Sequence, residues 1–308
     1  MQPFVKARLF VLPAVAALGL GLGLGLAAMT ALHAAKAAPL TAPLGVPDAP
    51  GGKVELAPHR AIYDLKLSKS NGSRGIQAVR GRIVYDFSGS SCEGYQLHFR
   101  QVSELDSAEG KPALSDLRST TWEDGEAKNF RFNSENRLND KVTDAVDGRA
   151  ERRASGVEVT LTKPKSKTFS APADVVFPTD HMRRIVDAAR AGKTILEFPV
   201  YDGSESGEKL YNTLTVIGRP IDPVKKPADD AGVNVAAPAK MPRWPVTISY
   251  FEQKGEKAEH TGEQTPVYAI TFELYDNGVS RALILDYNDF TITGTMTSLE
   301  MKKEKACQ

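Results

Sequence analysis

The chain has 308 residues, a formal net charge of +1 at pH 7, and ordinary fractions of hydrophobic (41%) and charged (25%) residues. These proportions are typical of a globular protein and exclude a mostly disordered chain. The near-zero net charge also excludes a strongly basic surface for nucleic acid or for an anionic membrane. Partners must therefore be recognised by shape or by local chemistry.

The first residues have the order of a secretion signal. Lys6 and Arg8 precede an almost wholly apolar run at residues 9–28, and small residues follow at Ala35-Lys36-Ala37. This order of charge, apolar segment and small-residue exit predicts a signal peptide over residues 1–37. An uncleaved membrane anchor is the alternative, because the run is about as long as a membrane-spanning helix. The alternating leucine and glycine residues within the run disfavour that helix.

Cleavage after Ala37 would remove three basic residues and no acidic one, so the net charge would change from +1 to −2. The exported protein would then have no transmembrane segment and would reside in an oxidising compartment, the periplasm. Residues 38–56 are rich in Pro, Ala and Gly and predict an extended tether. A single β-rich domain is expected over residues 57–308.

Within this domain, apolar residues alternate with polar ones, as they do in half-buried β-strands. In the first such segment Ala61, Tyr63 and Leu65 lie on one face, while Asp64 and Lys66 lie on the other. The same alternation recurs at residues 83–87, 95–99, 157–161, 246–250, 268–274 and 283–287. We expect more than ten strands.

Turn dipeptides of the kind preferred by two-residue hairpins separate many of these segments. They are Asn71-Gly72, Asp124-Gly125, Asp147-Gly148 and Asn277-Gly278. Consecutive strands are therefore expected to pair antiparallel.

One segment has helical spacing instead, with apolar residues at Met182, Ile185, Val186 and Ala189. It follows Pro178, which suits the first turn of a helix. Either Thr179 or Asp180 is expected to cap its start, and Gly192 is expected to end it.

Residues 219–242 are rich in proline and show no apolar period, so we expect a long exposed loop within a single domain. Many antiparallel strands with one short helix predict a mostly β fold. The candidates are a many-stranded curved sheet, a barrel, or an incompletely closed β-barrel.

The chain has two cysteines, Cys92 and Cys307. An even number of cysteines in an exported protein favours a disulfide, with two unpaired thiols as the alternative. A bridge would fasten the C-terminus to the N-terminal third of the chain. The chain-entropy model gives an upper estimate of about 5 kcal/mol for its stabilising effect.

No motif indicates a catalytic centre, a cofactor or a metal site. Four histidines, His59, His98, His181 and His260, are widely separated and lack partners at the spacing of metal ligands. The string Gly203-Ser204-Glu205-Ser206-Gly207 fails the nucleophile-elbow pattern, because glutamate occupies the central position.

The same string, read from Asp202, resembles the first half of a calcium-binding loop. Thr213, however, stands where that loop needs a bidentate glutamate. We therefore expect Asp202, Gly203 and Ser204 to form a structural turn in which side chains bond the local backbone.

Two further groups of residues are expected to be structural. The paired acids Glu123-Asp124 and Asp229-Asp230 lie in turn or loop contexts, where solvated charge is the usual explanation. Four aromatic residues fall within strand patterns, so packing in the core or on the sheet is favoured over stacking on a ligand. They are Trp122, Phe130, Phe132 and Trp244.

Several short motifs occur together in a distinctive order. The domain opens with Ala57-Pro58-His59-Arg60-Ala61-x-Tyr63, Phe177-Pro178-Thr179-x-His181 precedes the helix, and Tyr201-Asp202-Gly203-Ser204 follows it. Together with Cys92 and Cys307, these motifs resemble the EipB-like family of periplasmic cell-envelope integrity proteins of Gram-negative bacteria. The resemblance covers residues 54–307. It implies a spiral-like, incompletely closed β-barrel, a Cys92–Cys307 disulfide, and a role in maintaining the envelope. It carries over no catalytic residue.

The leading hypothesis is therefore a non-catalytic protein that maintains the envelope by binding a periplasmic protein or an envelope component. An exposed strand edge or the concave face would bind the partner, and a second copy of the chain is one such partner. The first alternative is a carrier of a lipid or other apolar ligand in a groove lined by Tyr, Phe and Leu. The second is a periplasmic hydrolase, for which His59, His98 and His181 are the natural bases near neutral pH.

Overall fold

The computed structural model describes residues 54–71, 75–108, 110, 112–222, 241–253 and 264–303. Several predicted features lie outside the described residues: the signal peptide, most of the tether, Gly72, most of the loop at 219–242 with Asp229-Asp230, His260 and Cys307. Within the described ranges, no helix has the length and apolar character needed to cross a membrane.

Fourteen strands form one antiparallel sheet. Their bounds are β1 (His59–Ser70), β2 (Ile76–Ser90), β3 (Gly94–Ser107), β4 (Ala113–Glu123), β5 (Asn129–Leu138), β6 (Lys141–Arg153), β7 (Gly156–Lys163), β8 (Lys167–Ala171), β9 (Ile195–Val200), β10 (Tyr211–Ile217), β11 (Arg243–Glu252), β12 (Tyr268–Tyr275), β13 (Ser280–Asp286) and β14 (Phe290–Met301). One helix, α1 (Pro178–Arg190), separates β8 from β9 in the described chain.

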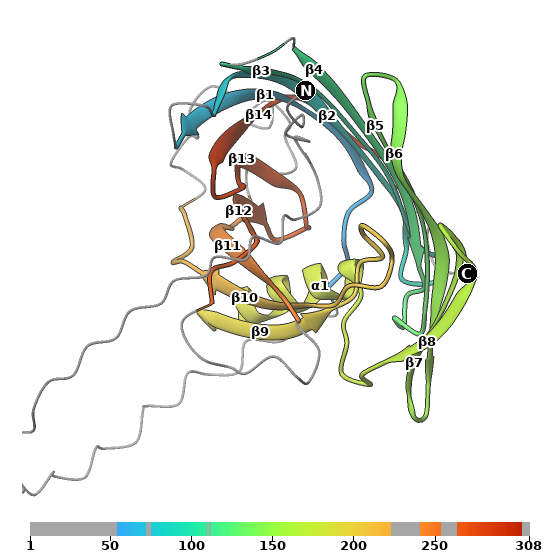
Figure 1. Cartoon of the computed structure of the whole chain (residues 1–308). Coiled ribbons are helices and arrows are strands. Elements are labelled where there is room, and N and C mark those ends of the chain that lie inside the picture. Colours follow the sequence, from blue (N-terminus) through green and yellow to red (C-terminus); the bar gives the residue numbers. More distant parts are fainter. Residues whose placement is uncertain are drawn as a thin grey trace, which may run out of the picture.

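The sheet curves around an interior but does not close (Figure 1). Strands β1–β8 and β9–β14 each pair in chain order, and β1 pairs with β14, which leaves β8 and β9 as the two edges. This arrangement confirms the predicted mostly β fold, an incompletely closed antiparallel barrel with one short helix.

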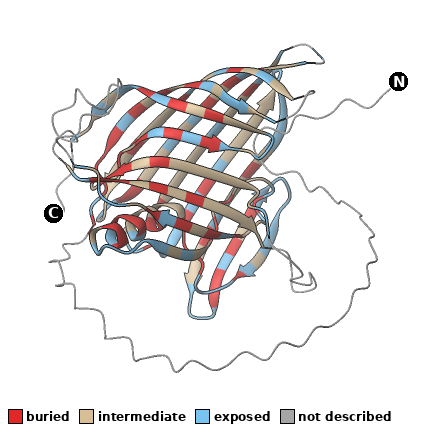
Figure 2. Cartoon of the chain, turned by 90° about the vertical axis from the view of Figure 1, so that its left-hand side faces the viewer, coloured by how far each residue is buried: buried red, intermediate tan, exposed pale blue. Residues whose placement is uncertain are grey.

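The predicted alternation decides which side chains form the core, as the banded strands of Figure 2 show. On β1, Ala61, Tyr63 and Leu65 are at most 3% exposed and face inward. Val54 and Leu56 also belong to this core, so the packed part of the chain begins within the segment expected to be a tether.

Helix α1 crosses the inside of the curved sheet and is held at both ends. At its C-terminal end, Arg190 forms a bidentate ion pair with Asp276 in the β12–β13 connection, at 2.6 and 2.9 Å. Its N-terminal end lies against β4, on the other side of the interior. Ile185 and Val186 are fully buried among the inward side chains of the sheet. The helix therefore fills one end of the barrel, which we name the helix end.

A second core occupies the gap between the edges β8 and β9. Its centre is a cluster of aromatic rings in which Phe130 lies 5.2 Å from Phe177 and Phe132 lies 5.6 Å from Tyr201, measured between ring centroids. Phe177 and Tyr201 come from the segments that flank α1 and β9. Side chains thus fill the space that strand pairing would fill in a closed barrel.

One predicted turn is wrong. Asp147-Gly148 lies inside β6, where the register against β7 shifts between the two residues, as in a β-bulge. A β-carbon on Gly148 would lie 2.7 Å from the ring of Phe132 and 2.9 Å from Leu161. The glycine serves close packing between strands there. By contrast, Asp124-Gly125 and Asn277-Gly278 do lie in connections between paired antiparallel strands.

The strand register brings Cys92 to the same region as the end of β14. Strands β2 and β14 flank β1 and run parallel to each other, because each is antiparallel to β1, and His59 pairs with both Phe87 and Met301. Cys92 is five residues beyond Phe87, and Cys307 is six residues beyond Met301. The ends of β2 and β14 therefore lie at the same end of β1, and the short sequence distances from them to the two cysteines are compatible with the predicted bridge. Cys307 itself lies outside the described residues, so the Cys92–Cys307 pairing stays a prediction.

We expect Cys92→Ser and Cys307→Ser to lower the melting temperature equally, because each removes the same crosslink. The free energy of unfolding should fall by about 5 kcal/mol at most. The double variant should be no less stable than either single variant, as thermal unfolding would show. Additive losses in the double variant would mean that the cysteines are not partners.

Candidate functional site

The three histidines considered as catalytic bases do not converge. His59 on β1 is buried, with its Nδ1 2.7 Å from the carbonyl oxygen of Ala57 and its ring stacked 5.4 Å from that of Tyr85. Burial lowers the pKa of His59, so the ring is neutral near pH 7. His98 is exposed on the outward face of β3.

His181 lies on α1 and is also buried, with its Nε2 3.4 Å from the Thr213 hydroxyl. Burial lowers the pKa of His181 to about 4. Each histidine therefore lies in a separate environment. In the parts of the chain that the structure describes, no three His, Cys, Asp or Glu side chains are placed to hold a metal ion.

Asp202, Gly203 and Ser204 form a tight turn after β9. The Ser204 amide donates a hydrogen bond to Asp202 Oδ1 at 2.9 Å. Gly203 has a φ of +67°, and a β-carbon there would lie 2.4 Å from the ring of Phe132. The turn thus depends on glycine and packs against β5.

Glu123 was expected to be a solvated charge, and this expectation is wrong. Its side chain is only 1% exposed and lies at the N-terminus of α1. Glu123 Oε2 accepts a hydrogen bond from the Thr179 amide, and Oε1 accepts one from the Asp180 amide, each at 2.8 Å. A carboxylate from β4 therefore caps the helix, in place of the expected cap from Thr179 or Asp180 themselves.

The pKa of Glu123 reflects opposing effects. Burial disfavours the charged carboxylate and raises the pKa of Glu123 to about 7, although the two helix amides favour the charge. The nearby charge of Asp180 also raises the pKa of Glu123, and Asp180 itself forms ion pairs with Arg183 at 3.0 Å and Arg184 at 2.8 Å. The helix end is therefore a polar junction inside an apolar core.

The end of the barrel opposite α1 has a different lining. A row of inward-facing aromatic side chains runs across β11, β12, the β13–β14 connection and the start of β14, with neighbouring ring centroids 5.0 to 5.8 Å apart. Its members are Tyr250, Tyr268, Tyr287 and Phe290, and we call it the aromatic row. All four side chains are only partly buried, whereas inward side chains at the helix end, such as Tyr95 and Leu274, are at most 1% exposed. Apolar surface thus remains accessible inside the barrel.

The two sheet edges are poorly suited to adding a strand from a partner. β8 has five residues and begins with Lys167, and β9 has six residues and contains Glu197 and Pro199. The end of β9 is already covered, because the Val176 amide donates to the Pro199 carbonyl at 2.8 Å. Short strands, charge and proline are the usual ways in which proteins protect an edge.

Of the four aromatic residues expected to pack in the core or the sheet, three lie in the core and Trp122 packs on the outer surface of the sheet. Phe130, Phe132 and Trp244 are at most 6% exposed, but Trp122 lies on the outward face of β4, partly exposed and opposite Arg131. Its strand gives no alternation signal, because the inward positions of β4 include Ser115 and Glu123. The face of Trp122 could not be read from the pattern.

The raised pKa of Glu123 predicts a pH-dependent stability. The pKa of Glu123 in the folded state lies above its value in the unfolded chain. Protonated Glu123 therefore stabilises the fold fully below the unfolded-state pKa, and this stabilisation is lost as the pH rises through about 7. Relative to Glu123→Gln, which cannot ionise, the free energy of unfolding of the natural protein should fall by up to about 3 kcal/mol between mildly acidic and mildly basic pH. Urea denaturation at a series of pH values measures this free energy for the natural protein and for the variant.

The matched control is Glu126→Gln, which removes an exposed carboxylate from the same β4–β5 connection. Equal pH profiles for the two variants would contradict the assignment to Glu123. Glu123→Ala leaves both helix amides without an acceptor and should destabilise the protein more than Glu123→Gln at every pH.

Comparison with known proteins agrees with this architecture. The EipB-like family matches residues 50–303 of the chain. The cell envelope integrity protein EipB of Brucella abortus (strain 2308) is 36% identical over 248 residues, which cover 80% of this chain and 85% of that protein. A crystal structure of a β-barrel-like protein of domain of unknown function DUF1849, also from Brucella abortus, aligns with a TM-score of 0.73 and 35% identity. That alignment covers 81% of this chain and all of the other. The chain therefore belongs to the EipB-like family.

Proposed function

We propose that this protein maintains the integrity of the cell envelope from the periplasm by binding an envelope component, without catalysing a reaction. The envelope role rests on the similarity to the cell envelope integrity protein EipB. Residence in the periplasm rests on the predicted signal peptide and on the two cysteines, which suit an oxidising compartment.

The aromatic row is the observation that best supports binding, and it favours an apolar group of the envelope component. Four adjacent rings keep accessible apolar surface inside the barrel. Water contacts this surface unless an apolar ligand covers it. Burial raises the pKa of Tyr250, Tyr268 and Tyr287, so their phenols stay neutral at physiological pH. A neutral, partly apolar lining suits an acyl chain or an apolar peptide segment.

The row has no free positive charge beside it in the described chain, since the nearby lysine is neutralised and the charges that act on Tyr250 and Tyr268 include the carboxylates of Asp202 and Asp286. Lys209 forms ion pairs with Glu205 at 2.5 Å and with Glu252 at 3.2 Å, and the Tyr211 hydroxyl donates to Glu205 at 2.9 Å. Apolar contact rather than charge is therefore the expected source of affinity. The short, protected edges of β8 and β9 argue against strand addition as the binding mode.

A deletion strain tests the envelope role. Loss of the gene should lower survival in detergent or in a cell-wall antibiotic, and the natural gene should restore it. Unchanged survival of the deletion strain would count decisively against an envelope role.

Substitutions within the aromatic row test the binding surface. Tyr250→Ser with Tyr268→Ser should fail to restore survival although the protein accumulates normally, because apolar surface inside the barrel is lost. Ile284→Ser is the control, since Ile284 is a large apolar residue that is 41% exposed on the other side of the sheet. Full complementation by a folded double variant would exclude the row as the binding surface. Mass spectrometry of gently extracted protein would identify the ligand.

A further inference from the structure

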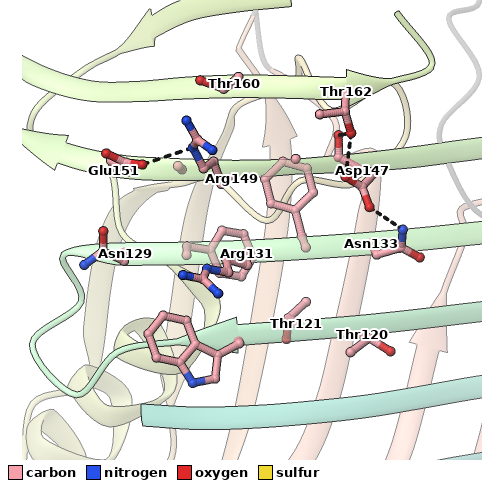
Figure 3. A pocket seen from close by; sticks show the side chains of 15 residues that line it. Thr120, Thr121, Asn129, Arg131, Asn133, Asp147, Arg149, Glu151, Thr160 and Thr162 are labelled. Carbon is pink, nitrogen blue, oxygen red and sulfur yellow. Dashed lines mark hydrogen bonds and ion pairs between the residues drawn. The ribbon is translucent and has the colours of Figure 1, made fainter. Parts of the chain in front are cut away.

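The outward face of the sheet carries a groove that is separate from the barrel interior. It has a volume of about 460 Å³ and crosses β4, β5, β6 and β7. Figure 3 shows its polar side chains, which come from all four strands. Arg131 and Arg149 are exposed, whereas Phe130, Phe132 and Ala150 next to them in sequence are at most 4% exposed. The arginines therefore lie on the opposite side of the sheet from the core.

The two arginines form an unusual pair. Arg131 on β5 lies directly opposite Arg149 on β6. Like charges in directly opposed positions destabilise a sheet. Arg149 is paired with Glu151 at 3.0 Å, but among the described residues no carboxylate lies within ion-pair distance of Arg131. The sheet thus holds an excess of positive charge at one end of the groove, where an anion would be stabilised.

Trp122 provides an aromatic surface beside this positive charge. The guanidinium of Arg131 lies 5.1 Å from the centre of the Trp122 ring. A β-carbon on Gly94 would lie 2.8 Å from the indole, so the absence of a side chain there makes room for the ring on the sheet surface. Trp122 on β4 lies directly opposite Arg131 on β5, at the cationic end of the groove. The electron-rich face of an indole attracts the partly positive C–H groups of a pyranose ring.

The other end of the groove is rich in hydrogen-bonding groups. Asp147 is held in place by Asn133, which donates to Oδ2 at 2.6 Å, and by Thr162, which donates to Oδ1 at 2.5 Å. These two hydrogen bonds lower the pKa of Asp147, so it stays a carboxylate. Thr120, which lies opposite Asn133, adds a hydroxyl-bearing side chain at this end. Such a group of fixed acceptors and donors suits the hydroxyls of a sugar.

We propose that this groove binds a saccharide that carries a carboxylate or a phosphate group. The sugar ring packs on Trp122, the acidic group lies between Arg131 and Arg149, and the hydroxyls contact the Asn133–Asp147–Thr162 end. Arginine is well suited to this task, because its planar donors match carboxylate and phosphate oxygens. This site is on the opposite side of the sheet from the aromatic row, so it does not depend on the proposed function.

Binding is tested with three probes and the purified protein. They are the β-1,4-linked disaccharide of N-acetylglucosamine and N-acetylmuramic acid, the neutral disaccharide of N-acetylglucosamine, and N-acetylglucosamine 1-phosphate. The chain has two tryptophans, and Trp244 is only 6% exposed. Trp244→Phe therefore leaves Trp122 as the reporter, and calorimetry on the natural protein provides a second measurement. Both acidic probes should shift the fluorescence, and the neutral disaccharide should bind at least about 10-fold more weakly.

Arginine variants decide whether the groove is responsible. Arg131→Gln and Arg149→Gln should each weaken binding of the acidic disaccharide by about 10-fold or more. Arg82→Gln is the matched control, because Arg82 is as exposed as Arg149, at 60%, and pairs with Asp64 at 2.9 Å. It should leave binding unchanged.

Three results would overturn the proposal. The first is that neither acidic probe binds, and the second is that the neutral disaccharide binds equally well. The third is that Arg82→Gln weakens binding as much as the groove variants do, since this would indicate general charge attraction. Binding of only one acidic probe would support the site and identify carboxylate or phosphate as the preferred group.

Discussion

A single buried carboxylate organises one end of this barrel. Glu123 accepts hydrogen bonds from two amides at the start of α1, and Arg190 at the other end of the helix pairs with Asp276. A helix of 13 residues is about 20 Å long, so α1 acts as a strut across the interior. Because the helix fills this end, inward side chains there are fully buried. The aromatic row at the opposite end receives no such cover.

The incomplete closure of the barrel has a similar physical basis. Strands β8 and β9 do not need to pair, because Phe177 and Tyr201 pack against Phe130 and Phe132 in the space between them. Hydrophobic contact replaces backbone hydrogen bonds between β8 and β9. The backbone groups of these two edge strands are protected because the strands are short and carry charged residues or proline. The curved sheet therefore stays open without offering a long free edge.

The two faces of the sheet differ in chemistry and can serve different ligands. The inward face presents neutral aromatic rings, which suit an apolar group, whereas the outward face over β4–β7 presents Trp122 with two opposed arginines. A protein of the cell envelope meets both kinds of chemistry, since acyl chains and acidic sugars occur there together. Separate faces would let the protein bind one without displacing the other.

The sequence by itself determined the features that depend on neighbours along the chain. The period of two places Tyr63 and Leu65 in the core, and Pro178 and Gly192 bracket the helix within two residues. Tertiary structure decided the rest, because it depends on residues far apart in sequence. Glu123 caps a helix 57 residues away, and the outward position of Trp122 is hidden by the polar inward residues of β4. The Asp147-Gly148 dipeptide became a bulge because packing against Phe132 outweighed its local turn preference.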